Sequence, residues 1–161
     1  MHSPRRVAVA VAVVIGTGAL LLAAGPAAAH VEPDPNRVKP GKVATVGFTP
    51  EHGCDDSPIT NMRFRIPKGA TDVTPEPKDG WEVTATTRTV TFSGGTMPSD
   101  ETDAFEITFT APTEKTILSW KVVQRCEEGV ERWIEAPDGE LPAPQVGVGK
   151  QVAAEDEHHD D

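Results

Sequence analysis

The sequence predicts an all-β fold, an antiparallel β-sandwich of immunoglobulin-like or cupredoxin-like type. Short segments alternate between apolar and polar residues, which is the pattern of half-buried strands. Turn sequences rich in glycine and proline separate these segments. No long stretch beyond residue 29 has the 3.6-residue period of an amphipathic helix. About seven short strands with frequent turns favour two packed sheets, and the pattern does not separate the two topologies.

The expected strands follow one another closely along the chain. A proline-punctuated extended stretch over 31–40 opens the domain. In segment 61–66, Met62, Phe64 and Ile66 face one way and polar residues face the other. Segment 117–124 is more continuously apolar, which favours a central strand. The other expected strands are 43–48, 81–85, 90–92, 105–109 and 130–135, with turns at 67–69, 78–80, 94–95 and 128–129.

The first 29 residues read as a secretory signal peptide. Arg5 and Arg6 precede an apolar run over 7–24, and three alanines at 27–29 fit a small-residue cleavage site. An uncleaved membrane anchor is the alternative, because the run is near the lower length limit for spanning a bilayer. Cleavage after Ala29 makes His30 the first residue of an exported protein, secreted or held in the cell envelope.

Cleavage also defines the composition of the mature chain. Removing 29 of 161 residues leaves 132, and losing two arginines and no acid takes the net charge from −10 to −12. This charge argues against nucleic acid binding, and it suits a soluble exported protein or one that attracts cations.

We expect one domain over 30–137, followed by a proline- and glycine-containing linker and a disordered acidic tail over 138–161. His158 and His159 in this tail bind metal weakly at most, and a solvated linker is the simpler interpretation. No second apolar run follows, so we expect no membrane span in the mature chain.

Cys54 and Cys126 are the two cysteines. In an exported chain such a pair predicts a disulfide, which would stabilise the fold by about 4 kcal/mol in the chain-entropy model. The alternative is a pair of thiolate metal ligands or a redox couple, which the absence of C-x-x-C spacing disfavours.

His30 and His52 are the histidines available to a metal inside the domain. An N-terminal histidine offers its α-amine and ring Nδ1 to one ion. His52 follows Glu51 in the loop after the first regular strand, close to Cys54. A lone loop histidine is ordinarily just solvated. Pairing of the N-terminal arm with the first strand would bring His30 near this loop. The resulting planar nitrogen and oxygen donors suit Cu(II).

The mature domain, from His30 to Pro137, resembles the YcnI-like copper-binding family. The motifs that carry the resemblance are Ala29-His30-Val31, Pro50-Glu51-His52-Gly53-Cys54, Ser57-Pro58-Ile59-Thr60, Ile66-Pro67-Lys68-Gly69, Gly80-Trp81, Phe92-Ser93-Gly94-Gly95, Val123-Gln124-Arg125-Cys126 and Arg132-Trp133-Ile134-Glu135. Single pieces are weak signals, but their order together is a specific match.

The resemblance implies a β-sandwich that binds Cu(II) through a histidine brace at the mature N-terminus. It assigns the brace to His30, a glutamate ligand to the Glu51 region and a tryptophan near the metal to Trp133. This chain departs from the pattern by offering His52 in the same loop. We therefore predict His52 as the second protein ligand, with Glu51 as its alternate. Trp81 and Trp120 are expected to be core residues.

The function we expect is copper handling by an exported protein that is not an enzyme, acting as a chaperone, buffer or delivery protein. The expected partners are the copper ion and a membrane copper transporter or another copper chaperone. Two alternatives remain open: a copper-dependent oxidative enzyme, and an adhesion or scaffold domain in which His30 is incidental. The absence of tyrosine and the small number of tryptophans disfavour an enzyme that grips polysaccharide.

Overall fold

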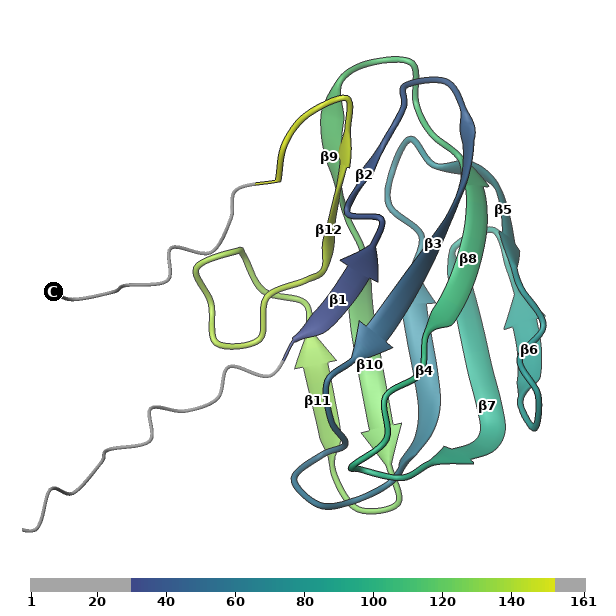
Figure 1. Ribbon diagram of the computed structural model, residues 1–161, viewed down its shortest axis with the longest axis vertical. Coiled ribbons are helices and arrows are strands. Elements are labelled where there is room, and N and C mark those ends of the chain that lie inside the picture. Colours follow the sequence, from purple (N-terminus) through teal and green to yellow (C-terminus); the bar gives the residue numbers. More distant parts are fainter. Residues whose placement is uncertain (1–29, 153–161) are drawn as a thin grey trace, which may run out of the picture.

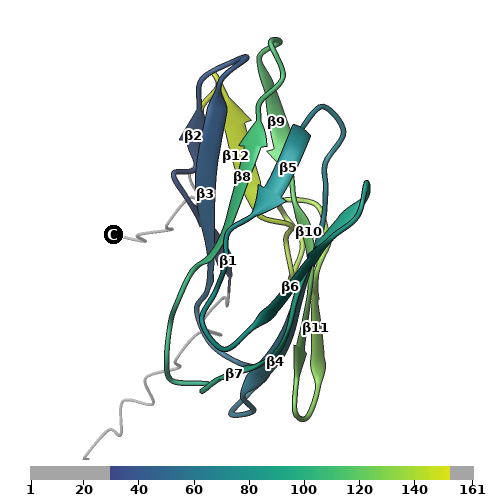
Figure 2. The same ribbon diagram turned by 90° about the vertical axis from the view of Figure 1, so that its right-hand side faces the viewer.

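The computed structural model describes residues 30–152, and it is a sandwich of two β-layers (Figures 1 and 2). This range contains no helix, and accordingly no helix in it is long and apolar enough to cross a membrane. The predicted all-β antiparallel sandwich is confirmed. The strands are β1 (Val31–Asp34), β2 (Arg37–Val38), β3 (Val43–Pro50), β4 (Ile59–Arg65), β5 (Thr71–Pro75), β6 (Glu82–Ala85), β7 (Thr89–Met97), β8 (Phe105–Thr110), β9 (Thr116–Ser119), β10 (Lys121–Cys126), β11 (Val130–Trp133) and β12 (Gln145–Val148).

The strands form three hydrogen-bonded sheets. One layer is built on a four-stranded sheet in the order β1-β3-β8-β5, and the facing layer is a five-stranded sheet in the order β11-β10-β4-β7-β6. A small sheet, β2-β12-β9, lies at one end of the sandwich (Figure 1). All of these ladders are antiparallel except the pairing of β2 with β12.

The core lies between the two layers and follows the predicted alternation. In β4, Met62 and Phe64 are fully buried whereas Arg63 and Arg65 are exposed. Phe48 of β3 contacts Phe64 of the facing sheet at 5.1 Å between ring centroids. Inward aromatic side chains thus join the two layers, and burial of their apolar surface stabilises the sandwich.

The single strand predicted over 117–124 is two strands. The strand is interrupted at Trp120, whose backbone N–H donates to the carbonyl of Pro144 at 2.8 Å. Before this point β9 belongs to the small sheet, and after it β10 belongs to the five-stranded sheet. Continuous apolarity therefore marks a strand that changes sheets, which periodicity alone does not distinguish from a central strand. The Trp120 ring is fully buried, as predicted, and Trp81 packs half-buried against the core.

The predicted domain boundary at Pro137 is too early. The chain returns to the sandwich as β12, where Val146 and Val148 are fully buried. Strand β12 completes the small sheet by pairing with β9 and β2. The short segment after Pro144 resembles a linker in sequence because a four-residue strand carries little periodic signal. Residues 1–29, predicted to be a signal peptide, and the tail histidines His158 and His159 lie outside the described residues.

Candidate metal centre

The register between the first two long strands places His30 beside Glu51. Val31 pairs with Pro50, so the next pair outward is His30 with Glu51. The backbone N–H of Glu51 donates to the carbonyl of His30 at 3.1 Å. Residues directly opposite in an antiparallel pair project to the same side of the sheet. Accordingly, the Glu51 carboxylate accepts a hydrogen bond from the backbone nitrogen of His30 at 3.2 Å.

The ring of His52 is engaged within its own loop. Its Nδ1 lies 2.7 Å from the carbonyl oxygen of Gly53, and because that oxygen only accepts, Nδ1 must carry the proton. The carbonyl of His52 in turn accepts a hydrogen bond from Nε2 of Gln124 at 2.9 Å. The structure therefore brings Glu51, and not the His52 ring, onto the nitrogen of His30.

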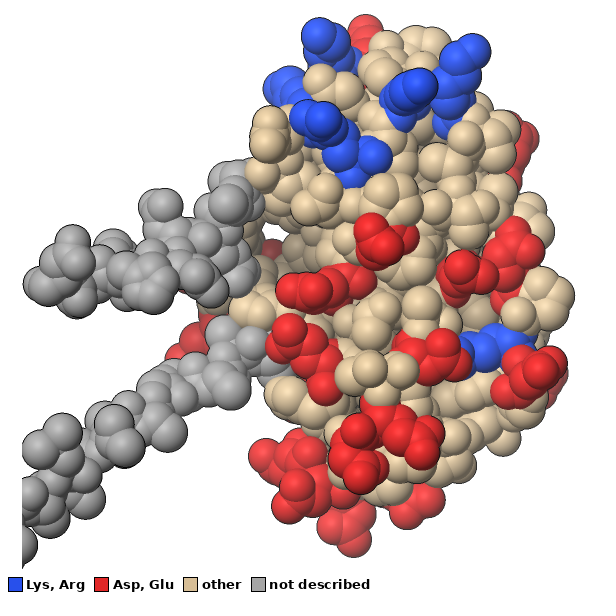
Figure 3. Space-filling view, in the orientation of Figure 1, with Lys and Arg blue, Asp and Glu red and all other residues tan. Residues whose placement is uncertain are grey.

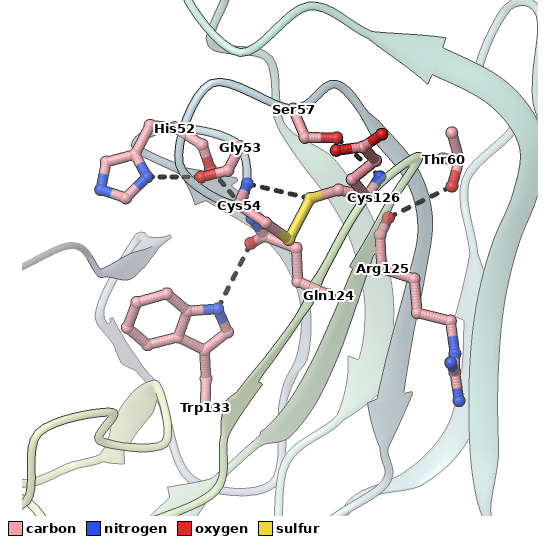
Figure 4. Close-up of a disulfide and its surroundings, with 10 residues drawn as sticks. His52, Gly53, Cys54, Ser57, Thr60, Gln124, Arg125, Cys126 and Trp133 are labelled. Atoms are coloured by element: carbon pink, nitrogen blue, oxygen red, sulfur yellow. Dashed lines mark hydrogen bonds between the residues drawn. A yellow bond between two sulfur atoms is a disulfide. The ribbon is translucent and has the colours of Figure 1, made fainter.

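The loop that follows Glu51 is fastened to the facing sheet by a disulfide. Cys54 and Cys126 are bonded across 72 positions of sequence, as predicted, with their Cα atoms 5.9 Å apart (Figure 4). The N–H of Cys54 donates to the sulfur of Cys126 at 2.9 Å. The N–H of Glu128 also donates to the hydroxyl of Ser57 at 2.8 Å. These contacts hold the loop on the end of β10, close to Glu51, which directly follows β3.

Trp133 reaches this loop through one buried polar side chain. The indole is 1% exposed, and its Nε1 donates to Oε1 of Gln124 at 3.3 Å (Figure 4). Gln124 is fully buried and also donates to the loop carbonyl described above. Gln124 was not among the site residues predicted from the sequence. Its signal was present, because Gln124 lies between Val122 and Cys126 on the apolar side of an alternating strand.

Glu131 is a second residue that sequence reasoning did not identify. It pairs across the strands with Gln124, and its Oε2 is buried with no hydrogen-bond partner among the described residues. Burial raises the pKa of the Glu131 carboxyl, and the nearby charge of Asp55 adds to this, while the charge of His52 acts in the opposite direction. The loop end of the sandwich thus holds a carboxyl that is poorly solvated when ionised.

The donor set decides what kind of metal site is possible here. Among the described residues, no three His, Cys, Asp or Glu side chains converge as a ready metal cluster. His30 and Glu51 do meet, but a third donor has to come from the main chain. The nitrogen of His30 is the atom already beside the carboxylate. A peptide nitrogen is a poor donor because its lone pair is delocalised, whereas a free α-amine is a good one. If His30 is the first residue, its free α-amine would supply the donor that the side chains lack.

The face around His30 is acidic. In Figure 3, Asp and Glu side chains gather over the part of the surface formed by β1, β3 and β8. Glu32 and Asp34 of β1 and Glu106 of β8 are exposed. The strand pairing places Asp34 opposite Gly47 and Gly47 opposite Glu106, so these carboxylates share one row. Such a field raises the local concentration of cations.

The fold is an immunoglobulin-like β-sandwich with one disulfide, Cys54–Cys126. A crystal structure of an uncharacterized protein from Nocardia farcinica, described as an immunoglobulin-like fold, is similar to it with a TM-score of 0.63 and 21% identity, over 74% of this chain and 97% of that one. The chain belongs to the family described as "Domain of unknown function (DUF1775)", whose model matches residues 30–148 and so begins at His30. This is the YcnI-like family that the sequence motifs indicated.

Other similarities are weaker. The solution structure of CaCohA2 from Clostridium acetobutylicum is 16% identical with a TM-score of 0.40, over 74% of this chain and 88% of that one. A type I cohesin from Pseudobacteroides cellulosolvens is 11% identical with a TM-score of 0.41, over 81% and 96% of the two chains. Comparison with curated proteins gave no match.

Proposed function

We propose that this protein is exported and binds one Cu(II) ion at His30, made N-terminal by cleavage after Ala29, in order to handle copper in the cell envelope. The observation that supports this most directly is the 3.2 Å contact between the His30 nitrogen and the Glu51 carboxylate. It joins the one nitrogen that cleavage would convert to an amine with an oxygen ligand, on an acidic face.

The donors available after cleavage match the preferences of Cu(II). The amine and Nδ1 of His30 close one chelate ring, and Glu51 adds a carboxylate oxygen from the neighbouring strand. Nitrogen and oxygen donors in a tetragonal arrangement are preferred by Cu(II), which also heads the divalent affinity order. Because the pairing of β1 with β3 sets the spacing of His30 and Glu51, little reorganisation is needed to bind the ion.

The contacts favour Glu51 over His52 as the second protein ligand. Glu51 already meets the His30 nitrogen, whereas Nδ1 of His52 is occupied by a carbonyl in its own loop. We therefore propose Glu51 as the ligand and His52 as a loop residue whose carbonyl anchors Gln124. Trp133 would then act by holding this loop through Gln124.

A binding role is favoured over an oxidative enzyme because the described residues offer no aromatic platform for a polysaccharide. All five phenylalanines are inside or packed into the core, as are Trp120 and Trp133, and Trp81 is half-buried against Phe105. Enzymes that grip polysaccharides commonly stack sugar rings on exposed aromatic side chains. A membrane copper transporter or another copper chaperone is the class of partner this role requires.

The decisive experiment is a Cu(II) titration by calorimetry and electron paramagnetic resonance. Protein that begins at His30 should bind one ion tightly, and protein that begins at Ala29 should lose at least about two orders of magnitude in affinity because the amine is displaced. Glu51→Gln should weaken binding by about tenfold or more, while the neighbouring His52→Gln should change it little. Affinity should fall as the pH drops below the normal range of an α-amine, about 8.

Three results would contradict the proposal or a part of it. Equal copper affinity of the two N-terminal forms would show that His30 is not a brace, and the scaffold interpretation would then lead. Loss of affinity in His52→Gln but not in Glu51→Gln would return the ligand assignment to His52. Oxidation of a glycan panel by the copper-loaded protein with peroxide would instead favour the enzyme.

A further inference from the structure

The outer face of the five-stranded sheet carries a concentration of positive charge in a chain whose net charge is −10. This sheet is the right-hand layer in Figure 2, on the side of the sandwich opposite the sheet that holds His30. The exposed cations on this face come from three neighbouring strands and one turn: Arg63 and Arg65 of β4, Lys121 and Arg125 of β10, Arg132 of β11, and Arg88 before β7.

The strand pairing places like charges directly opposite one another. Lys121 of β10 pairs with Arg65 of β4, and a like-charged cross-strand pair is destabilising. Within residues 30–152, the described ion pair is Lys78 with Asp103, and the cations of this face take no part in it. The fold therefore keeps a repulsive arrangement that it does not neutralise internally.

Four of these six cations line a groove across the strands. The hollow has a volume of about 660 Å³, and its lining includes Arg63, Arg65, Arg88 and Lys121 together with the apolar residues Val123 and Ile134. None of its lining residues is acidic.

A second hollow of about 460 Å³ lies next to the groove. It shares Arg65 and Lys121 with the groove and adds Lys68. Glu82 of the edge strand β6, opposite Ser93, lines neither hollow.

The backbone at the rim of the groove is held by hydrogen bonds. The hydroxyl of Thr86 accepts from the N–H of Arg88 at 3.2 Å and from the N–H of Thr89 at 3.0 Å. The carbonyl of Arg88 accepts from the N–H of Ile66 in the neighbouring chain segment at 2.9 Å. The main chain that carries Arg88 is therefore preorganised, which lowers the entropic cost of binding.

We propose that this groove binds a small soluble ligand that carries two or more phosphate groups. Three arginines and one lysine converge on one recess, and guanidinium groups bind phosphate oxygens through paired hydrogen bonds. A multiply charged phosphate places compensating charge between Arg65 and Lys121, where the protein supplies none. A hollow of this volume with apolar residues in its lining favours a small ligand over a flat membrane surface. This site is independent of copper, because it lies on the other sheet.

The test uses the full chain, purified as the cell processes it, with inorganic pyrophosphate as the probe. Calorimetry at about 0.15 M salt should show saturable binding, since charges this close are only partly screened. The double variant Arg65→Gln/Lys121→Gln should bind at least about tenfold more weakly. The matched control, Arg125→Gln/Arg132→Gln, removes the same charge from the same face outside both hollows and should lose less than about threefold.

A second measurement separates loss of the site from loss of the fold. Removing the repulsive pair should leave the melting temperature of Arg65→Gln/Lys121→Gln equal to or above that of the wild type. Pyrophosphate should raise the melting temperature of the wild type and of the control variant Arg125→Gln/Arg132→Gln, but not that of the groove variant.

Equal losses in the groove and control variants would overturn the proposal, as would absence of pyrophosphate binding. Equal affinity for citrate, a polycarboxylate of similar charge, would also overturn the phosphate assignment. Groove-dependent binding to phosphatidylglycerol vesicles without pyrophosphate binding would assign the face to a membrane surface instead.

Discussion

Replacing Gln124 by leucine tests whether the buried polar link between Trp133 and the loop stabilises the fold. Gln124 is fully buried, donates to the carbonyl of His52 and accepts from the indole of Trp133. Leucine is close to glutamine in volume, so the change removes hydrogen bonds and leaves little cavity. It leaves two groups, the His52 carbonyl and the indole N–H, without this partner.

The expected cost follows from those two groups. The indole N–H is buried and the His52 carbonyl is part-buried. A buried group that loses its partner costs about 1–3 kcal/mol, and the added apolar burial of leucine offsets part of the sum. We expect the free energy of unfolding to fall by about 3 kcal/mol. For a domain of this size this corresponds to a fall in melting temperature of about 10 °C.

The assay is urea unfolding followed by tryptophan fluorescence with the disulfide kept oxidised. Trp133→Phe removes the same indole donor, and Trp81 and Trp120 remain as reporters. Both changes remove the same hydrogen bond, from Trp133 to Gln124. The loss of stability in the double variant should therefore be smaller than the sum of the two single losses by about 1 kcal/mol. Gln151→Leu, at an exposed glutamine, is the matched control and should change stability by less than about 0.5 kcal/mol.

Two outcomes would refute this reasoning. If Gln124→Leu is as stable as the wild type, the buried glutamine contributes no net stability. If the costs of Gln124→Leu and Trp133→Phe add fully, the two side chains do not act as one network.

Three further predictions concern the disulfide and two carboxyl groups. The double variant Cys54→Ala/Cys126→Ala should lose about 4 kcal/mol of unfolding free energy in the chain-entropy model, read from its denaturant midpoint, and an unchanged midpoint would contradict the loop-closure argument. Burial raises the pKa of the Glu131 carboxyl, so the wild type should lose stability as the pH rises above the ordinary glutamate range. Glu131→Gln should therefore be more stable than the wild type at pH 7 and lose this advantage below about pH 4. A difference in stability that does not change with pH would argue against burial as the cause. The hydrogen bond from Lys78 lowers the pKa of the Asp103 carboxyl, so the stability from this pair is present above about pH 4 and is lost as the pH falls through the lowered pKa. Because Asp103 is largely exposed, Lys78→Gln should cost less than about 1 kcal/mol at pH 7, measured by thermal unfolding, and a larger loss would point to the packing of the lysine stem instead.

The alternation of apolar and polar residues was enough to predict most of the fold. In β4 it identified the inward side chains correctly, and it located β8, because a strand that is buried on one face repeats every two residues. The edge strand β5 and the return strand β12 were missed. Threonine, aspartate and proline dominate β5, and β12 is too short to show a period, so neither has an apolar pattern of its own.

For the candidate metal centre, the sequence by itself determined which groups are available. These are His30 beside a predicted cleavage site, the Glu51 carboxylate and the His52 imidazole in one loop, and a cysteine pair that holds that loop. The sequence did not decide between Glu51 and His52 as the neighbour of His30. The register of β1 on β3 decided that, because pairing Val31 with Pro50 makes Glu51 the residue opposite His30. A shift of one residue would have brought His52 there instead.

The basic groove shows the same division. The polar positions of β4 and β10 are visible in the sequence as outward-facing arginine and lysine residues. Only the tertiary structure decided that Arg65 and Lys121, which are far apart in the chain, lie directly opposite one another on one sheet. Local sequence determines the face on which a side chain lies, whereas its neighbours across the sheet depend on pairings between distant segments, and these are selected by burial of the whole core.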